Sequence, residues 1–125
     1  MRVLLDTHTA IWWFNDPAAL DVQARATLED GETTAFLSAA SVWEAATKAA
    51  SGRLDLPTTL PEAAQRTGVF ELAVRWVHAQ RAAELPPIHR DPFDRFLVAQ
   101  AMVENLVLMT RDALLVRYPV ATMLA

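Results

Sequence analysis

Two aspartates three positions apart, Asp91 and Asp94, stand in the segment His89–Ala101, which has the sequence HRDPFDRFLVAQA. Pro92 between them suits the first position of a helix, because its missing N–H would have no partner there. Asp91 then falls at the N-cap and Asp94 in the first turn. The segment predicts a helix that begins with two carboxylates, and it leaves open whether Asp94 does more than favour the helix start.

Three further acids stand at junctions between apolar runs and helical segments, namely Asp6, Glu44 and Asp112. Short apolar runs such as Val3–Leu5 and Leu106–Thr110 are typical of strands buried on both faces of a parallel sheet. The carboxyl ends of parallel strands share one edge, and ligands bind in the crevice there. We therefore expect the acids that follow these two runs to reach that edge, with Glu44 and Asp94 brought nearby by helix N-termini.

Each acid also has a purely structural explanation. Asp6 can cap the helix after it, Ser41 and Glu44 match a capping box, and Asp94 and Asp112 can favour helix dipoles. Four carboxylates in one crevice, however, repel one another and are costly to remove from water. A hard divalent cation such as Mg²⁺ or Mn²⁺ resolves that conflict, because it takes oxygen ligands and needs few carboxylates. A cation held in this way suits the hydrolysis of phosphate esters.

Polar neighbours of these acids are candidate contacts to substrate or water. Thr7 and Thr110 can hold waters or ligands through their hydroxyls. Arg95 and Arg111 can meet a phosphate in fork geometry, or can form surface ion pairs instead. Lys48, the only lysine, lies four residues after Glu44, and an exposed ion pair between the two is the leading explanation of its position. Orientation of that glutamate, or contact with phosphate, is its alternative role.

The histidines and tryptophans offer weaker signals. No histidine pair has ligand spacing, so we expect surface or hydrogen-bonded side chains at His8, His78 and His89. His89 is the one expected to line the cleft. Core packing or a dimer face is the leading expectation for Trp12, Trp13, Trp43 and Trp76. Stacking of these rings on RNA is the less favoured alternative.

Helical and extended segments alternate along the chain, which predicts an α/β fold. Further strands are expected at Thr34–Leu37 and Val69–Val74, with an edge strand at residues 120–123. Helices are expected to begin near residues 7, 17 and 41, and over residues 60–67, 76–85, 92–101 and 111–118. In the helix 76–85 the expected inward residues are Trp76, Ala79 and Ala83. The result is a single domain, residues 1–125, with a mostly parallel sheet of four to five strands and helices on both faces.

Composition narrows the class of protein. The net charge is −4, with ten arginines and one lysine, whereas a general nucleic-acid coat would be basic. The chain has no cysteine, which excludes disulfides, thiolate zinc sites and a cysteine nucleophile. Three glycines do not provide a glycine-rich phosphate loop. The apolar run at the N-terminus is too short for a signal peptide, and no run approaches the ~20 residues of a membrane span. We expect a cytoplasmic protein without membrane contact.

Four segments of the chain resemble the PIN-domain ribonucleases, and in particular the VapC toxins of bacterial toxin–antitoxin pairs. They are, in family order, LLDTHTAIWW, SAASVWEAATKAASGRLDLP, LPPIHRDPFDRFLVAQA and LVLMTRD. The resemblance implies a three-layer PIN-like fold and an endoribonuclease dependent on Mg²⁺ or Mn²⁺. The family's acidic quartet would fall on Asp6, Glu44, Asp94 and Asp112. A small antitoxin that occupies the cleft is also implied, together with a homodimer or a toxin–antitoxin hetero-oligomer.

Other classes of protein share parts of this pattern. A non-catalytic PIN-like domain would keep the fold for binding partners, but the intact set of four acids speaks against it. A phosphoacceptor receiver domain needs a lysine after a late strand, whereas Lys48 lies in an early helix. A haloacid-dehalogenase-like phosphatase needs Asp-x-Asp, whereas Asp6 is followed by Thr7 and His8. The nuclease is therefore the favoured prediction.

Overall fold

The computed structural model describes residues 1 to 125. Its strands are β1 (Arg2–Leu5), β2 (Thr34–Ser38), β3 (Phe70–Leu72), β4 (Val107–Thr110) and β5 (Thr122–Leu124). Its α-helices are α1 (Thr7–Asn15), α2 (Val22–Glu29), α3 (Ala39–Ala50), α4 (Leu60–Thr67), α5 (Trp76–Glu84) and α6 (Pro92–Glu104). Two short 3₁₀-helices are η1 (Pro17–Ala19) and η2 (Leu115–Arg117). None of the helices combines the length and the apolar composition that crossing a bilayer requires.

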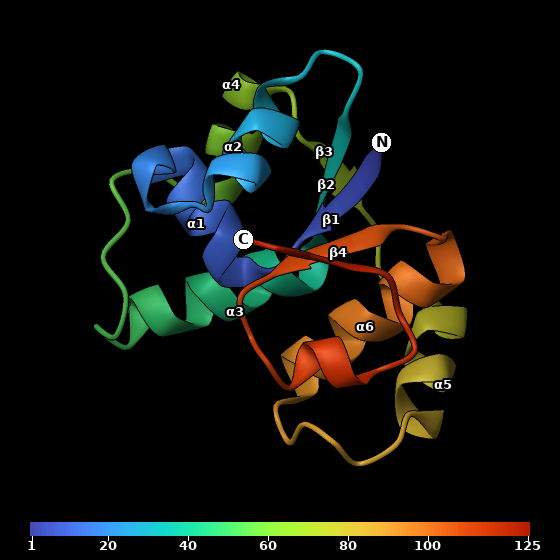
Figure 1. The fold of residues 1–125 in the computed structure, drawn as a ribbon. Coiled ribbons are helices and arrows are strands. Elements are labelled where there is room, and N and C mark those ends of the chain that lie inside the picture. The colour runs from blue at the N-terminus through green and yellow to red at the C-terminus, as the bar shows by residue number, and fades with distance from the viewer.

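All neighbouring strands run parallel, in the order β3-β2-β1-β4-β5. β1 occupies the centre, where Leu5 lies beside Leu37 of β2 and beside Met109 of β4. The chain moves outward from β1 through β2 to β3, then returns to the other side of β1 to form β4 and β5 (Figure 1). This reversal places a topological switch point between β1 and β4, the position where ligands bind in open α/β sheets.

Helices cover both faces of the sheet (Figure 1). Successive residues of a strand point to opposite sides, so Val3 and Leu5 enter one core cluster and Leu4 enters another. The first cluster contains residues of α1, α2 and α4, and the second contains residues of α5 and α6. Val3, Leu4 and Leu5 are completely buried, and only Arg2 of β1 is exposed. The predicted three-layer α/β architecture is confirmed, and the sheet is wholly parallel with five strands.

The helix α3 lies where the strands end and contacts both α1 and α6. It begins at Ala39, before the expected Ser41, because the Ser38 hydroxyl caps it by accepting the Ala40 N–H at 3.0 Å. The capping box between Ser41 and Glu44, which was the purely structural explanation of Glu44, is therefore not formed. Those two side chains lie beyond the cap and are turned toward the neighbouring helix α1, as described below.

The buried side of α5 also differs from the prediction. Exposed positions include Trp76, Ala79 and Ala83, whereas the buried residues at this helix are His78, Ala82 and Leu85. Hydrogen bonds make the burial of a polar ring possible. Nδ1 of His78 accepts the Arg75 N–H at 3.0 Å, and Nε2 lies 2.9 Å from Oε1 of Glu104. Hydrophobicity alone pointed to the wrong stripe of the helix.

Smaller differences affect the ends of the chain's later elements. The expected strand Val69–Val74 is limited to β3, and the expected helix over residues 111–118 is only the short η2. The expected edge strand is present as β5, parallel to β4. Two tryptophans are surface residues rather than core residues, since Trp43 is 68% exposed and Trp76 is 93% exposed. Trp12 and Trp13 are partly buried against the first core cluster.

Arg95 fastens the C-terminal end of α5 to α6. Its guanidinium donates hydrogen bonds to the carbonyls of Ala82 at 2.9 Å, Leu85 at 3.2 Å and Pro86 at 2.9 Å. A cation at the C-terminus of a helix also interacts favourably with the helix dipole. These contacts assign Arg95 a structural role, in place of the phosphate contact suggested by its position next to Asp94.

We expect Arg95→Met to lower the free energy of unfolding by about 2 kcal/mol, because it removes charge-assisted hydrogen bonds to helix-terminal carbonyls. Urea unfolding would measure the change. Arg81→Met, at an exposed position of α5, serves as the control and should stay within about 0.5 kcal/mol of the parent. Equal effects of the two substitutions would contradict the structural role of Arg95.

Candidate functional site

Asp6 follows β1 directly and lies at the switch point of the sheet. Its Oδ1 accepts the Thr9 N–H at 2.8 Å and so caps α1, as the sequence predicted. Its Oδ2 accepts the hydroxyl of Thr110, the last residue of the adjacent strand β4, at 2.5 Å. The side chain is buried, with 6% of Asp6 exposed. Capping and orientation at the sheet edge are therefore combined in one carboxylate.

Asp112 is connected to Asp6 through the same threonine. The Asp112 N–H donates to Oγ1 of Thr110 at 3.0 Å, while the Thr110 hydroxyl proton points to Asp6. Oδ1 of Asp112 accepts the Leu114 N–H at 2.8 Å, which fixes the turn after β4. A single hydroxyl thus sets the positions of two carboxylates that follow neighbouring strands.

Glu44 is held from both sides in the space between α1 and α3. Its Oε1 accepts the Thr7 hydroxyl at 2.7 Å, and its Oε2 pairs with Nζ of Lys48 at 2.7 Å. The Ser41 hydroxyl lies 2.9 Å from that of Thr7. A hydroxyl carries one proton, so Thr7 donates to the carboxylate and accepts from Ser41. The ion pair between Glu44 and Lys48 is present, but it is not the exposed pair that was expected, because Glu44 is only 4% exposed.

His89 lies between the carboxylates of Asp94 and Asp112. Its Nε2 is 2.8 Å from Oδ2 of Asp112 and 3.3 Å from Oδ2 of Asp94. Nδ1 accepts the Asp91 N–H at 3.0 Å, so Nε2 is the nitrogen that carries the proton and donates it. The expectation that His89 lines the cleft agrees with this geometry. Its N–H bridge to two acids was not anticipated from the sequence.

The surroundings of Asp94 keep its carboxyl group protonated at higher pH than usual. Burial raises its pKa from 3.8 to about 7, and the negative charge of Asp91 adds to this effect. His89 lowers the pKa, while Glu44 and Asp6 raise it further. The influence of these acids on Asp94 indicates that the cluster behaves as one electrostatic unit.

The structure therefore brings the four predicted acids to one edge of the sheet. The tightest group consists of Asp94, Asp112 and His89, whose ligand atoms all lie within 4.8 Å of one another. Asp6 and Glu44 stand beside this group and are oriented by threonine hydroxyls. Carboxylate oxygens are the ligands that Mg²⁺ and Mn²⁺ prefer, so the chemistry of these donors fits a hard divalent cation.

The polar neighbours of the acids do not face substrate or water as the sequence suggested. Thr7 and Thr110 are 4% and 1% exposed, and both hydroxyls orient carboxylates rather than face solvent. Arg111 donates to the main-chain oxygens of Ala19 at 2.6 Å and Ala125 at 2.9 Å. Its guanidinium also stacks 4.2 Å from the ring centroid of Trp12. The threonines therefore orient the acids from within the fold, whereas Arg111 is an exposed residue that binds main-chain oxygens near the site.

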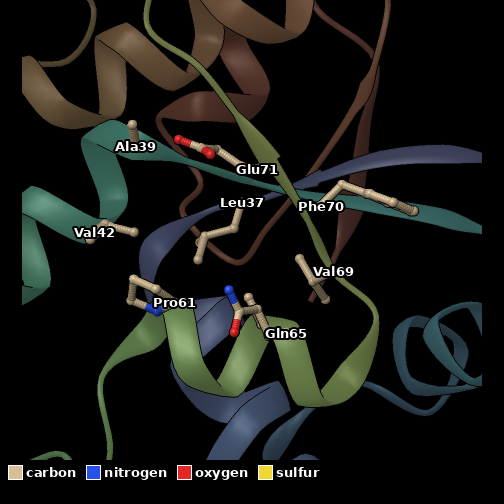
Figure 2. A pocket seen from close by; sticks show the side chains of 9 residues that line it. Leu37, Ala39, Val42, Pro61, Gln65, Val69, Phe70 and Glu71 are labelled. Carbon is tan, nitrogen blue, oxygen red and sulfur yellow. The ribbon is translucent and has the colours of Figure 1, made fainter.

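A hollow of about 230 Å³ lies elsewhere, between α4 and the strands β2 and β3 (Figure 2). Its lining is mainly apolar and includes Leu37, Val42, Pro61 and Val69. None of the four acids lines it, and its only charged lining residue is Glu71. This hollow has no group of metal ligands and no cationic side chain that could bind a phosphate. The acid cluster is therefore the candidate functional site.

The parallel fold and its acidic switch point agree with the comparison to known families. The chain belongs to the PIN domain family, whose model matches residues 3–121. Among individual proteins, it is similar to Ribonuclease VapC22 of Mycobacterium tuberculosis, with 31% identity over 113 residues. That match covers 88% of this chain and 86% of the relative.

Solved structures with the same fold include a toxin–antitoxin complex from Klebsiella pneumoniae, with a TM-score of 0.59 and 17% identity over 88% of this chain and 86% of that one. VapBC2 from Rickettsia felis, bound to a DNA fragment from its promoter, superposes with a TM-score of 0.74 and 14% identity, and the match covers 98% of each chain. FitAcB from Neisseria gonorrhoeae superposes with a TM-score of 0.61 and 20% identity, covering 99% of this chain and 97% of that one. At these identities the likeness shows the fold.

The pKa of Asp94 makes a prediction for the protein in EDTA. Between pH 3.8 and about 7 the folded state keeps a proton that the unfolded state has lost, so stability falls as pH rises. Asp94→Asn removes this titration. The stability of the variant relative to the parent should rise by on the order of 3 kcal/mol from pH 5 to pH 8. Urea unfolding at both pH values measures it, and a constant difference would contradict the raised pKa.

Proposed function

We propose that this chain is a divalent-metal-dependent endoribonuclease and the toxin of a toxin–antitoxin pair. The observation that carries the proposal is the gathering of Asp6, Glu44, Asp94 and Asp112 at the switch point of a PIN domain. The similarity to a protein named Ribonuclease VapC22 supports the choice of RNA as substrate. We expect the protein to act in the cytoplasm, where RNA is the accessible target.

The four acids are the proposed ligands of Mg²⁺ or Mn²⁺. When bound, the cation supplies a Lewis acid that neutralises charge on a phosphodiester and lowers the pKa of a water that it holds. The residues of the chain prepare the site for it. Thr110 and Thr7 turn Asp6 and Glu44 toward the cluster, and burial excludes bulk water from both carboxylates.

His89 has a separate part in this proposal, as a positioning residue. Because Nδ1 is occupied by the Asp91 N–H, the Nε2 proton is available to the oxygens of Asp112 and Asp94. Donation from a neighbouring imidazole fixes the orientation of a ligating carboxylate. The same proton offsets part of the repulsion between the two carboxylates before a cation binds.

A small antitoxin is the proposed protein partner. A solved structure with the same fold, from Klebsiella pneumoniae, is described as a toxin–antitoxin complex. A cluster of carboxylates in a cleft is complementary to an arginine-bearing segment, since a guanidinium pairs with carboxylates in fork geometry. Such a segment would compete with a divalent cation for the same oxygens. A homodimer of the toxin is a further expectation.

The alternative is a non-catalytic PIN domain that only binds partners. It does not explain why the structure confines several carboxylates at one buried edge, where the pKa of Asp94 reaches about 7. An arrangement that is unfavourable without a counterion is more readily understood as a cation site. Cleavage activity separates the two functions directly.

We expect the purified protein to cleave RNA in Mg²⁺ or Mn²⁺ and to lose cleavage in EDTA. Asp94→Asn should reduce the rate at least a hundredfold, because it removes a proposed metal ligand while Asn fits the same space. Asp21→Asn is the matched control, since Asp21 caps α2 away from the cluster and Asn also caps helices well. Equal cleavage by parent and Asp94→Asn would point to a contaminating nuclease and overturn the proposed function.

Metal binding has a readout that is independent of activity. Mg²⁺ at a hundred times its Kd should stabilise the fold by about 2.7 kcal/mol and so raise the melting temperature. Asp6→Asn keeps the cap on α1 and should reduce this rise in melting temperature. His89→Gln should raise the Mg²⁺ concentration required for it ten- to hundredfold, and the full rise should return at higher Mg²⁺. An unchanged melting curve of the parent in Mg²⁺ would contradict a preformed site.

A further inference from the structure

A basin of about 390 Å³ opens beside the acid cluster, between α3 and the start of α6. Its charged lining consists of three cationic side chains, Lys48, Arg53 and Arg90, and two acidic ones, Glu44 of the cluster and Asp91 at the start of α6. None of the functions considered so far uses the two arginines. The basin therefore joins proposed metal ligands to a group of cations within one hollow.

The two arginines have donors available for a ligand. Arg53 makes one side-chain hydrogen bond, from Nε to the Ser51 hydroxyl at 2.8 Å, which leaves its terminal nitrogens unengaged. Arg90 takes part in none of the ion pairs of the structure. Lys48 differs from them, because Glu44 already holds it. A guanidinium with free donors meets a phosphate in a bidentate manner.

A second hollow of about 520 Å³ adjoins the basin and is almost wholly apolar. Trp43, Phe93 and Phe96 provide its aromatic lining, and Val74 contributes from the segment before α5. Trp43 is 68% exposed and packs edge-on against Phe93, with 5.3 Å between ring centroids. The two hollows share Pro92 and Phe93, so they meet at the first turn of α6.

We propose that the basin and the aromatic hollow together form a nucleotide subsite, in which Arg53 and Arg90 hold an RNA phosphate and Trp43 receives an unpaired base. This inference rests on the proposed function and adds the path of the substrate to it. A phosphate in the basin lies beside Glu44, hence next to the phosphodiester at the cluster. The base attached to that phosphate then reaches the indole across Phe93.

Single-stranded RNA fits this surface better than a protein segment does. Proteins bind unpaired nucleotides by combining a cationic groove for the backbone with aromatic faces on which bases stack. Both features are present here at adjacent positions, with Trp43 exposed and two guanidinium groups unpaired. An apolar protein helix would use the aromatic hollow but would gain nothing from the arginines.

Charge-neutral variants test the basin. Binding of a fluorescein-labelled single-stranded RNA of about ten nucleotides would be followed by anisotropy across a salt series, with Ca²⁺ in place of Mg²⁺. For Arg53→Gln and for Arg90→Gln, the slope of log affinity against log salt should fall by about 0.7 each, as one phosphate contact is lost. Arg66→Gln, at an exposed position in the last turn of α4, is the control and should bind like the parent. Slopes equal to the control would overturn the subsite.

Substitutions of the exposed tryptophans test the aromatic hollow. Trp43→Ala should weaken RNA binding roughly five- to hundredfold, the loss expected for one stacked base, and Trp43→Phe should restore part of it. Trp76→Ala, which removes another exposed tryptophan outside this hollow, should bind like the parent. Equal binding by Trp43→Ala and Trp76→Ala would also overturn the subsite.

Cleavage by the same variants in Mg²⁺ separates the two levels of the proposal. If the parent binds RNA through these residues but cleaves none, the nuclease function fails and the subsite stands. If the parent cleaves RNA and the Arg53, Arg90 and Trp43 variants keep its KM, the subsite fails and the nuclease stands. Loss of inhibition by the antitoxin, with RNA binding unchanged, would reassign this surface to the protein partner.

Discussion

The hydrogen bond from the Thr110 hydroxyl to the Asp6 carboxylate links the fold to the chemistry of the site. It joins the ends of β1 and β4, the two strands between which the strand order of the parallel sheet reverses. The same hydroxyl accepts the N–H of Asp112, and the other oxygen of Asp6 caps α1. Because strand ends, helix start and two carboxylates converge on these atoms, a change in the strand register would displace the whole acid cluster. The position of the site is thus a consequence of the sheet topology.

Repulsion within the cluster is the cost of this arrangement, and the structure offsets it by three means. Hydroxyl and ammonium groups donate hydrogen bonds to the oxygens of the two most buried acids, Asp6 and Glu44. The Nε2–H of His89 serves the two remaining acids. Protonation of Asp94 relieves the rest, since its pKa of about 7 leaves a substantial neutral fraction near neutral pH. A divalent cation would supply the counter-charge that the Asp94 proton otherwise provides, which favours a cation site over a set of helix caps.

Local patterns were sufficient to predict the layers and the acids, but not the contacts that orient them. The buried run Val3–Leu5 and the segment after Pro92 have signals within a few residues, so the strand and the capped helix were predicted correctly. The partners of the acids lie far away in sequence. Thr110 is 104 residues from Asp6, and no local pattern connects them. The burial of His78 was missed for the same reason, because its partner Glu104 belongs to another helix. Side-chain types alone cannot distinguish an arginine that binds carbonyls from one that faces solvent.

The charge balance of the chain also becomes intelligible from the structure. A net charge of −4 would repel RNA if it were spread evenly, yet the acids and the free arginines occupy adjoining places. A cation at the carboxylates would reduce the negative potential there, and Arg53 and Arg90 place positive charge in the adjoining basin. Salt screens electrostatic effects beyond about 8 Å at physiological ionic strength. Charges that lie within this distance of the substrate therefore matter more than the net charge of the chain. In the proposed subsite, RNA affinity would depend on a bound cation and on the two arginines, which would allow an acidic chain to act on a polyanion.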